Sequence, residues 1–126
     1  MTIKNFEDIE SWKKARELAG YIYVLTQKES FARDFGLRDQ IRRAAGSIMH
    51  NIAEGFDSGT DPEFTRFLRM ARRSASEVQS ELYLALDCQY ITNEELEKAY
   101  NLAVEIKKLI NAFITYLRKR QPSSLN

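Results

Sequence analysis

Arginine is the residue type in this sequence whose spacing most suggests a chemical task. Positions 33–73 hold eight arginines and no lysine, whereas the rest of the chain holds three arginines and eight lysines. The planar guanidinium of arginine donates paired hydrogen bonds to a phosphate or a carboxylate, a geometry that the ammonium of lysine lacks. Helical spacing groups seven of these side chains into candidate contacts for nucleic acid or for another subunit: Arg38, Arg42, Arg43, Arg66, Arg69, Arg72 and Arg73.

Three interpretations of these arginines remain open. The backbone of RNA or DNA is one partner, and its binding would weaken steeply as the salt concentration rises. Carboxylates of a neighbouring subunit are another. In the third, the arginines form a solvated surface that acids partly neutralise, since Glu63, Glu77 and Asp39 each lie at helical spacing from an arginine. The spacing of the arginines predicts no aromatic ring among them on which a base could stack. It therefore does not by itself favour nucleic acid over the other two interpretations.

The residues that usually carry catalysis or bind metal are scarce. His50 is the only histidine and Cys88 the only cysteine, which is too few for a zinc site or for the paired Glu-x-x-His motifs of a di-iron bundle. The sequence has no glycine-rich phosphate loop and no nucleophile elbow. We interpret His50, with Asn51 and Glu54 near it, as structural, and Cys88 as a small core residue. We therefore expect no enzyme activity, cofactor, metal or small-molecule substrate.

The composition favours a single helical domain. A chain of 126 residues fits one domain, and five glycines with two prolines are too few for the turns of a β-sandwich or barrel. The net charge is only +1, from 19 basic and 18 acidic residues, so the chain is not basic as a whole. No apolar run approaches the ~18 residues of a membrane span, and the N-terminus has no apolar signal core. A lone cysteine fits a reducing compartment, so we expect a cytoplasmic protein.

Hydrophobic residues recur at three- and four-residue steps, which predicts helices over about 8–27, 37–56, 61–89 and 93–120, and a flexible tail over 121–126. The connections are short, so we expect an all-α fold, an antiparallel up-down-up-down four-helix bundle that takes up the whole chain. Thr60 with Glu63 and Thr92 with Glu95 predict capping boxes at the starts of the last two helices. The first helix is expected to bury Trp12, Ala15, Ala19, Ile22 and Tyr23.

The second predicted helix carries a specific run of residues: Gln-Ile-Arg-Arg-Ala-Ala at 40–45, Ser-Ile at 47–48 and Asn-Ile-Ala-Glu-Gly at 51–55. Accompanying residues on the first and third helices are Trp12, Ala15, Phe64, Phe67, Ala71 and Ser74. With these residues, the chain from about Phe6 to Leu117 resembles the 23S rRNA-intervening sequence protein family. The resemblance implies a small antiparallel helical bundle that assembles into a homopentamer and has no known enzyme activity.

The residues of this motif also have a physical interpretation. Glu54 is expected to accept hydrogen bonds from Arg43 or from a neighbouring helix, and Asn51 to satisfy backbone groups near the break that follows. Gly55 suits a point where a helix ends or another backbone comes close. We expect structural roles for Gln40, Ser47, Asn51, Ile52, Ala53, Glu54 and Gly55. The chain departs from the family pattern Ala-x-Gly-Ser-Leu, because Arg73 replaces the glycine and Ala75 the leucine, and the change adds a charge to the arginine surface.

Overall fold

The computed structural model describes residues 3–120, and every regular element in that range is helical. Four long helices make up most of the chain: α1 (Glu10–Leu25), α3 (Phe35–Phe56), α4 (Asp61–Asp87) and α5 (Asn93–Arg120). A 3-10 turn, η1 (Phe6–Asp8), precedes them, and a short helix, α2 (Glu29–Arg33), lies between α1 and α3. The prediction of an all-α fold is therefore confirmed, with α2 and η1 as unpredicted additions. The tail predicted for 121–126 lies outside the described residues.

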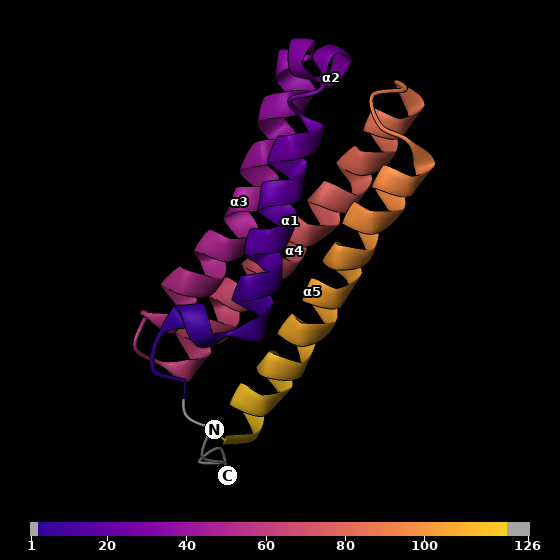
Figure 1. Ribbon diagram of the computed structural model, residues 1–126. Helices are drawn as coiled ribbons and strands as arrows, with labels where there is room; N and C mark the ends of the chain where they lie inside the picture. Colours follow the sequence, from indigo (N-terminus) through magenta and orange to yellow (C-terminus); the bar gives the residue numbers. More distant parts are fainter. Residues whose placement is uncertain (1–2, 121–126) are drawn as a thin grey trace.

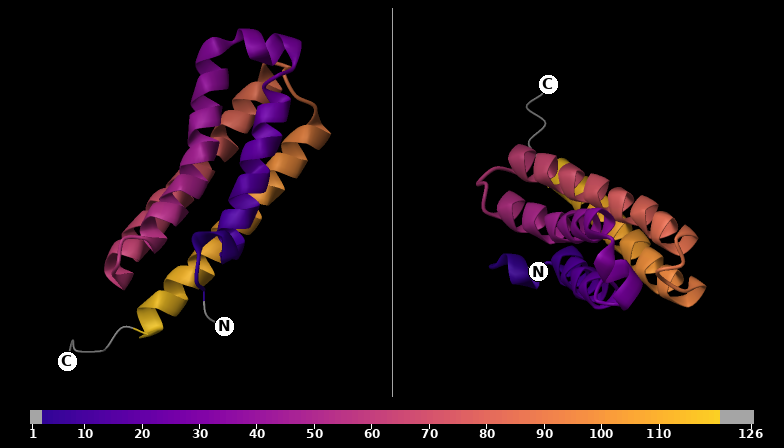
Figure 2. Two further views of the ribbon diagram at one scale, coloured as in Figure 1. Left: turned by 60° about the vertical axis from the view of Figure 1, so that its left-hand side comes forward. Right: turned by 90° about the horizontal axis from the view of Figure 1, so that it is seen from above.

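The long helices extend along the length of the molecule, and consecutive ones run in opposite directions (Figure 1). Helix α1 packs against α3 and α5, and α4 packs against the same two helices. Both Figure 1 and the left view of Figure 2 place α2 at one end of the molecule, beside the link between α4 and α5. No helix among residues 3–120 is long and apolar enough to cross a membrane.

The core follows the periodicity of the sequence. Fully buried side chains recur at three- and four-residue steps, for example Ile41, Ala45, Ile48 and Ile52 in α3 and Ala99, Ala103, Ile106 and Ile110 in α5. Burial of such rows is the main force that holds amphipathic helices together. Tyr23 departs from its prediction, since it is 46% exposed. Its neighbour Ile22 takes the inward position, and a helix turns by about 100° between adjacent residues, so Tyr23 falls at the edge of the buried face.

Short-range hydrogen bonds explain where two helices begin. Helix α1 begins two residues later than predicted because the chain first forms η1, in which the backbone amide of Asn5 donates to Asp8 Oδ2 at 3.2 Å. Helix α3 begins two residues earlier than predicted because the Asp34 side chain caps it, accepting the backbone amide of Leu37 at 3.1 Å. The break predicted between these helices therefore contains α2 and the first two residues of α3.

Of the two predicted capping boxes, the one before α5 forms in full. The amide of Thr92 donates to Glu95 Oε1 at 2.9 Å, and the amide of Glu95 donates to Thr92 Oγ1 at 3.1 Å. Before α4 only half of the box forms. Thr60 Oγ1 accepts the amide of Glu63 at 3.3 Å, but the Glu63 carboxylate binds Arg66 instead of turning back to Thr60.

Helix α4 ends two residues earlier than predicted, at Asp87. Gln89 adopts a left-handed backbone with φ of 63°, and the amide of Tyr90 donates to the carbonyl of Ala85 at 2.9 Å. A left-handed residue together with this backbone hydrogen bond is the Schellman motif, a common way for an α-helix to end. Cys88 lies between these residues and is exposed. The interpretation of Cys88 as a core residue is therefore wrong, because the helix ends before this position can turn inward.

Candidate functional site

The seven candidate arginines come from two helices and spread along the length of the molecule. Arg38, Arg42 and Arg43 lie in the first half of α3, toward the end that carries α2. The other four lie in the first half of α4, which begins at the opposite end: Arg66, Arg69, Arg72 and Arg73. The contacts of these side chains differ, and the differences decide which of them are available to a partner.

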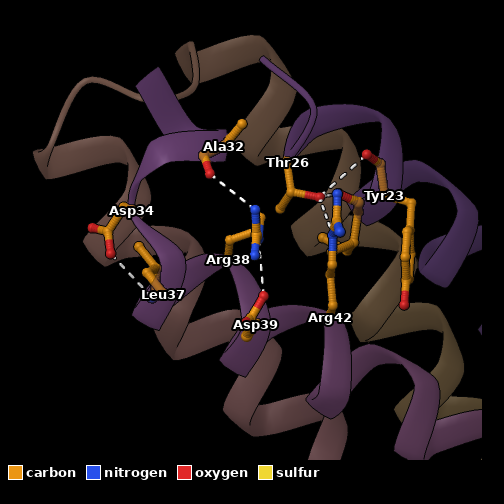
Figure 3. Close-up of polar contacts among 9 residues, drawn as sticks. Tyr23, Thr26, Ala32, Asp34, Leu37, Arg38, Asp39 and Arg42 are labelled. Carbon is orange, nitrogen blue, oxygen red and sulfur yellow. Dashed lines mark hydrogen bonds and ion pairs between the residues drawn. The ribbon is translucent and has the colours of Figure 1, made fainter. Parts of the chain in front are cut away.

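Arg42 is fixed to the end of α1. Its Nε donates to Thr26 Oγ1 at 2.8 Å, and its guanidinium lies 4.5 Å from the ring centre of Tyr23 (Figure 3). Thr26 is fully buried, and its hydroxyl donates to the carbonyl of Ile22 at 2.8 Å. The Thr26 hydroxyl therefore donates a hydrogen bond to the last turn of α1 and accepts one from Arg42 of α3. The aromatic face beside the guanidinium adds a cation–π contact.

Arg38 connects α3 to α2. Its Nη1 donates to the carbonyl of Ala32 at 3.1 Å, and its Nε donates to Asp39 Oδ1 at 2.9 Å (Figure 3). The guanidinium also lies 4.8 Å from the ring centre of Phe35, which is 63% exposed. The expectation of no aromatic ring among the arginines is thus wrong. Phe35 lies one helical turn before Arg38 on α3. The ring beside Arg42 belongs to Tyr23 of α1, and spacing along α3 does not reveal a contact with another helix.

The bond between Arg42 and Thr26 has a measurable consequence. Arg42→Lys keeps the positive charge but removes the planar Nε donor, so the buried Thr26 oxygen loses the hydrogen bond that it accepts and keeps the one that it donates to Ile22. We expect a loss of about 0.5–1.5 kcal/mol in the free energy of unfolding, measured by urea denaturation. Arg43→Lys is the matched control, because Arg43 is exposed and forms no hydrogen bond within residues 3–120; its expected effect is below about 0.5 kcal/mol. Equal losses in both variants would contradict the role of this bond.

On α4, Arg66 is neutralised by an acid of its own helix. Its Nε and Nη2 donate to Glu63 Oε1 at 2.9 and 2.6 Å. These hydrogen bonds lower the pKa of the Glu63 carboxyl below its usual value. The guanidinium also lies 4.7 Å from the ring centre of Phe67, and Nη1 approaches Met70 Sδ at 3.5 Å. Arg66 therefore remains exposed but is the most constrained of the α4 arginines.

The remaining α4 arginines have no acidic partner within residues 3–120. Arg72 Nη1 donates to Asn111 Oδ1 at 2.6 Å and so links α4 to α5. Arg69 and Arg73 are exposed and form no hydrogen bond or ion pair within the same range. Because position 73 faces outward, the arginine that replaces the family's glycine does not obstruct packing inside this chain.

The interpretation as a neutralised surface holds for only two of the three proposed acids. Asp39 binds Arg38 and Glu63 binds Arg66. Glu77 forms no ion pair with an arginine in the part of the chain that the structure describes. Glu77 lies instead one turn before Glu81, and its negative charge raises the pKa of the Glu81 carboxyl.

Two motif residues, Ser47 and Asn51, form a hydrogen-bonded cluster in α3 that reaches α4 through Ser47. The Asn51 side-chain amide donates to the carbonyl of Ser47 at 2.8 Å and to its Oγ at 2.9 Å. Ser74 of α4 donates to Ser47 Oγ at 3.0 Å, which links the two helices. The prediction that Asn51 satisfies the following break is wrong, since Ser58 Oγ takes that role by donating to the carbonyl of Gly55 at 2.6 Å.

The other motif residues divide between the core and the surface. Ile52 is fully buried and Ala53 is half-buried, whereas Gln40 and Glu54 are exposed. Glu54 accepts no hydrogen bond from Arg43. The two residues are separated by eleven positions of one helix, or about 16 Å at 1.5 Å per residue, which is too far for a contact.

Glu81 is a buried carboxyl that the sequence analysis missed. The residue is 7% exposed, and neither carboxylate oxygen has a hydrogen-bond partner within residues 3–120. The pKa of Glu81 is raised to about 7, chiefly by burial and further by the nearby Glu77, while the charge of Arg43 acts in the opposite direction. A signal was present, because Glu81 falls among the apolar positions Val78, Leu82 and Ala85 of α4.

The residues that could carry other chemistry do not meet. His50 is exposed in the second half of α3, and Cys88 is exposed after the end of α4. Because α3 and α4 run in opposite directions, the two lie toward opposite ends of the molecule. Within residues 3–120, no group of three or more histidine, cysteine or acidic side chains is placed to hold a metal ion.

Comparison with known proteins gives one family and one fold. Residues 7–112 match the family described as 23S rRNA-intervening sequence protein. A crystal structure of a protein with unknown function, from the S23 ribosomal protein family of Bacteroides thetaiotaomicron, has a similar fold with a TM-score of 0.77. The two sequences are 29% identical, and the match covers 83% of this chain and 95% of that chain. No curated protein matches this chain in sequence.

Proposed function

The chain belongs to the 23S rRNA-intervening sequence protein family, and from this premise we propose that it is a self-associating helical protein that binds RNA or DNA through the arginines of α4. The framework we propose is an antiparallel up-down-up-down four-helix bundle, with α2 as an addition between its first two helices. The assembly is a homopentamer, as the family resemblance implies. The proposal includes no catalytic centre, cofactor or small-molecule substrate, and it places the protein in the cytoplasm.

Arg69 and Arg73 carry the nucleic-acid proposal. They lie one turn apart on α4, both are exposed, and neither has an acidic partner within residues 3–120. Arg66 lies one turn before Arg69 and is also exposed. Neighbouring like charges on a helix repel each other by about 0.2–0.5 kcal/mol per pair. Phosphates that cross this face would relieve the repulsion and release their own counterions.

The α3 arginines support a second contact on the same partner. Arg42 lies over Tyr23 and Arg38 over Phe35, and these two aromatic residues are 46% and 63% exposed. Exposed aromatic rings beside arginine are what unstacked bases of a single strand bind. This arrangement favours single-stranded over fully paired nucleic acid.

The proposal predicts a change in salt dependence. The triple variant Arg66/Arg69/Arg73→Ala removes up to three phosphate contacts, so the slope of log K against log salt should become shallower by about 2–3. Fluorescence anisotropy with labelled RNA and DNA over a series of salt concentrations measures this slope. The matched control, Lys4/Lys13/Lys108→Ala, removes the same charge from exposed positions elsewhere and should change the slope little. Equal slopes for both triple variants, or no binding at low salt, would refute the proposal.

The alternative function is a scaffold whose arginines contact other subunits. Large apolar side chains on α4 favour it, because Tyr83 is 49% and Leu84 52% exposed. Exposed apolar surface of this kind commonly marks a protein interface. The Arg66/Arg69/Arg73→Ala variant distinguishes the two functions in sedimentation experiments. If it dissociates the assembly without unfolding the helices, the arginines are subunit contacts; an intact assembly excludes this alternative.

A further inference from the structure

A line of polar side chains follows the seam between α3 and α4. Ser74 of α4 donates to Ser47 Oγ of α3 at 3.0 Å, which puts the two residues at one level of this antiparallel pair. Arg43 lies one turn before Ser47, so it shares that face of α3 and lies about 6 Å away along the axis. Glu77 and Glu81 lie one and two turns after Ser74, at about 4.5 and 10.5 Å along α4 in the same direction. The register therefore places Arg43 between two carboxyl groups.

Glu81 lacks the counter-charge that a buried carboxylate needs. It is buried, and neither of its carboxylate oxygens has a hydrogen-bond partner within residues 3–120. Arg43 is exposed and forms no hydrogen bond or ion pair in the same range. An ionised carboxyl is strongly disfavoured in a protein interior unless a cation pairs with it. Glu81 must therefore either keep its proton or bring a cation close.

Arg43 is the cation that can take this role. Within residues 3–120, the charges that act on Glu81 are those of Glu77, on its own helix, and of Arg43, on α3. The other helix that packs against α4 is α5. Its Lys107 donates to Gln79 at 3.0 Å, and Gln79 lies two positions before Glu81, or about 200° around the helix. Lys107 therefore faces the opposite side of α4 from the seam.

Arg43 also lies beside the arginines that carry the nucleic-acid proposal. Arg73 precedes Ser74 by one residue, so it lies about 8 Å from Arg43 along the helix axes. Both arginines are exposed, one on each side of the seam. A phosphate backbone bound to Arg73 can therefore extend to Arg43, provided that Arg43 is not drawn toward Glu81.

We propose that the proton of Glu81 controls whether Arg43 is available to a nucleic-acid partner. The inference rests on the proposed function and adds regulation by pH to it. With its proton bound, Glu81 is neutral and leaves Arg43 available to a phosphate. When the proton passes to solvent, the carboxylate attracts the guanidinium and competes with the phosphate for it.

The change falls near neutral pH. Burial is the main cause that raises the pKa of Glu81 to about 7, so Glu81 is mostly protonated at pH 6 and mostly ionised at pH 8. The affinity for nucleic acid should thus fall as the pH rises through this range. The coupling is reciprocal, because a phosphate on Arg43 makes Glu81 hold its proton more tightly by the same factor.

NMR tests the pair of side chains without nucleic acid. The ¹³C signal of the Glu81 carboxyl is followed in the full-length protein from pH 4.5 to 9. Arg43→Gln removes the neighbouring positive charge and should move the midpoint of this titration to higher pH, by roughly half a pH unit. Arg16→Gln, at an exposed position on α1, is the matched control and should leave the midpoint unchanged. Equal midpoints in all three proteins would overturn the inference.

Oligonucleotide binding tests the consequence. Fluorescence anisotropy at fixed salt compares the affinity for labelled single-stranded RNA and DNA at pH 6 and pH 8. The natural chain should bind roughly threefold more tightly at pH 6, which is the fold-change that corresponds to half a pH unit. Glu81→Gln should bind with the tighter affinity at both pH values, because its side chain never becomes charged. Arg43→Gln should bind with the weaker affinity at both.

His50→Gln controls for the other side chain that titrates in this range, because His50 is the only histidine. This variant should keep the difference between pH 6 and pH 8. A difference that persists in Glu81→Gln, or disappears in His50→Gln, overturns the switch and leaves the proposed function standing. No binding of RNA or DNA at either pH refutes the proposed function and with it the regulation, and the NMR midpoints then show separately whether Glu81 and Arg43 interact.

Discussion

Gly55→Ala is expected to lower the free energy of unfolding by about 1–3 kcal/mol. An added Cβ at this buried position would lie 2.7 Å from Phe67 Cβ and 2.8 Å from Phe64 Cδ1. Real Cβ atoms essentially never come so close, and Phe67 Cβ is attached directly to the backbone of α4, so α3 and α4 must move apart. The expected fall in melting temperature is roughly 3–12 °C, measured by circular dichroism at fixed protein concentration.

Gly20→Ala is the matched control, and it should have the opposite sign. Gly20 is exposed on α1, and an added Cβ would meet nothing within 4 Å. Alanine in a helix is favoured over glycine by about 0.8–1.0 kcal/mol because glycine loses more backbone entropy on folding. The same substitution thus stabilises one helix and destabilises its neighbour. A stabilising Gly55→Ala variant would show that the motif glycine does not serve close approach of α3 to α4.

Glu81→Gln is expected to abolish a loss of stability that the natural protein suffers as the pH rises. The folded state holds the Glu81 proton up to a pH of about 7, whereas the unfolded chain releases it near pH 4.5. Between these values the folded state binds more protons than the unfolded state, so the free energy of unfolding falls as the pH rises. The loss is complete above about pH 7 and amounts to at most about 3 kcal/mol.

Urea denaturation from pH 4.5 to 8 tests this sign. The stability advantage of Glu81→Gln over the natural chain should grow with pH and level off above about 7, because glutamine carries no charge. Glu77→Gln removes the neighbouring carboxylate and should produce a smaller effect in the same direction. Glu97→Gln, at an exposed position on α5, is the control and should leave the profile unchanged. A pH-independent difference between Glu81→Gln and the natural chain would contradict the buried charge as its cause.

The spacing of apolar residues was enough to predict the long helices, because helix formation depends on residues that are close together in the sequence. Apolar residues at three- and four-residue steps located all four long helices to within two residues at either end. The errors came from a capping side chain in one case and from a backbone reversal in the other. Asp34 begins α3 early, and the left-handed Gln89 ends α4 early. Helix α2 was missed because its five residues are too short to show a period.

The positions of the arginines could likewise be read from the sequence, but their partners on other helices could not. Thr26 for Arg42 and Asn111 for Arg72 come from other helices. Which side chains meet across two helices depends on the rotation and axial register of each helix, and spacing along one helix contains neither quantity. For the same reason, Pro62, Thr65, Arg69 and Arg118 line one small surface hollow only because α4 packs against α5.

The sequence by itself determined an all-helical chain, the limits of its long helices to within two residues, the arginine-rich stretch and the family. Tertiary structure alone decided which arginines are bound to other helices, because Asp61 of α4, for example, meets Arg120 of α5 only once the helices pack. It also decided that Gly55 lies against two phenylalanines and that Glu81 is removed from water. These are properties of contacts between helices, and a contact needs the relative placement of both surfaces.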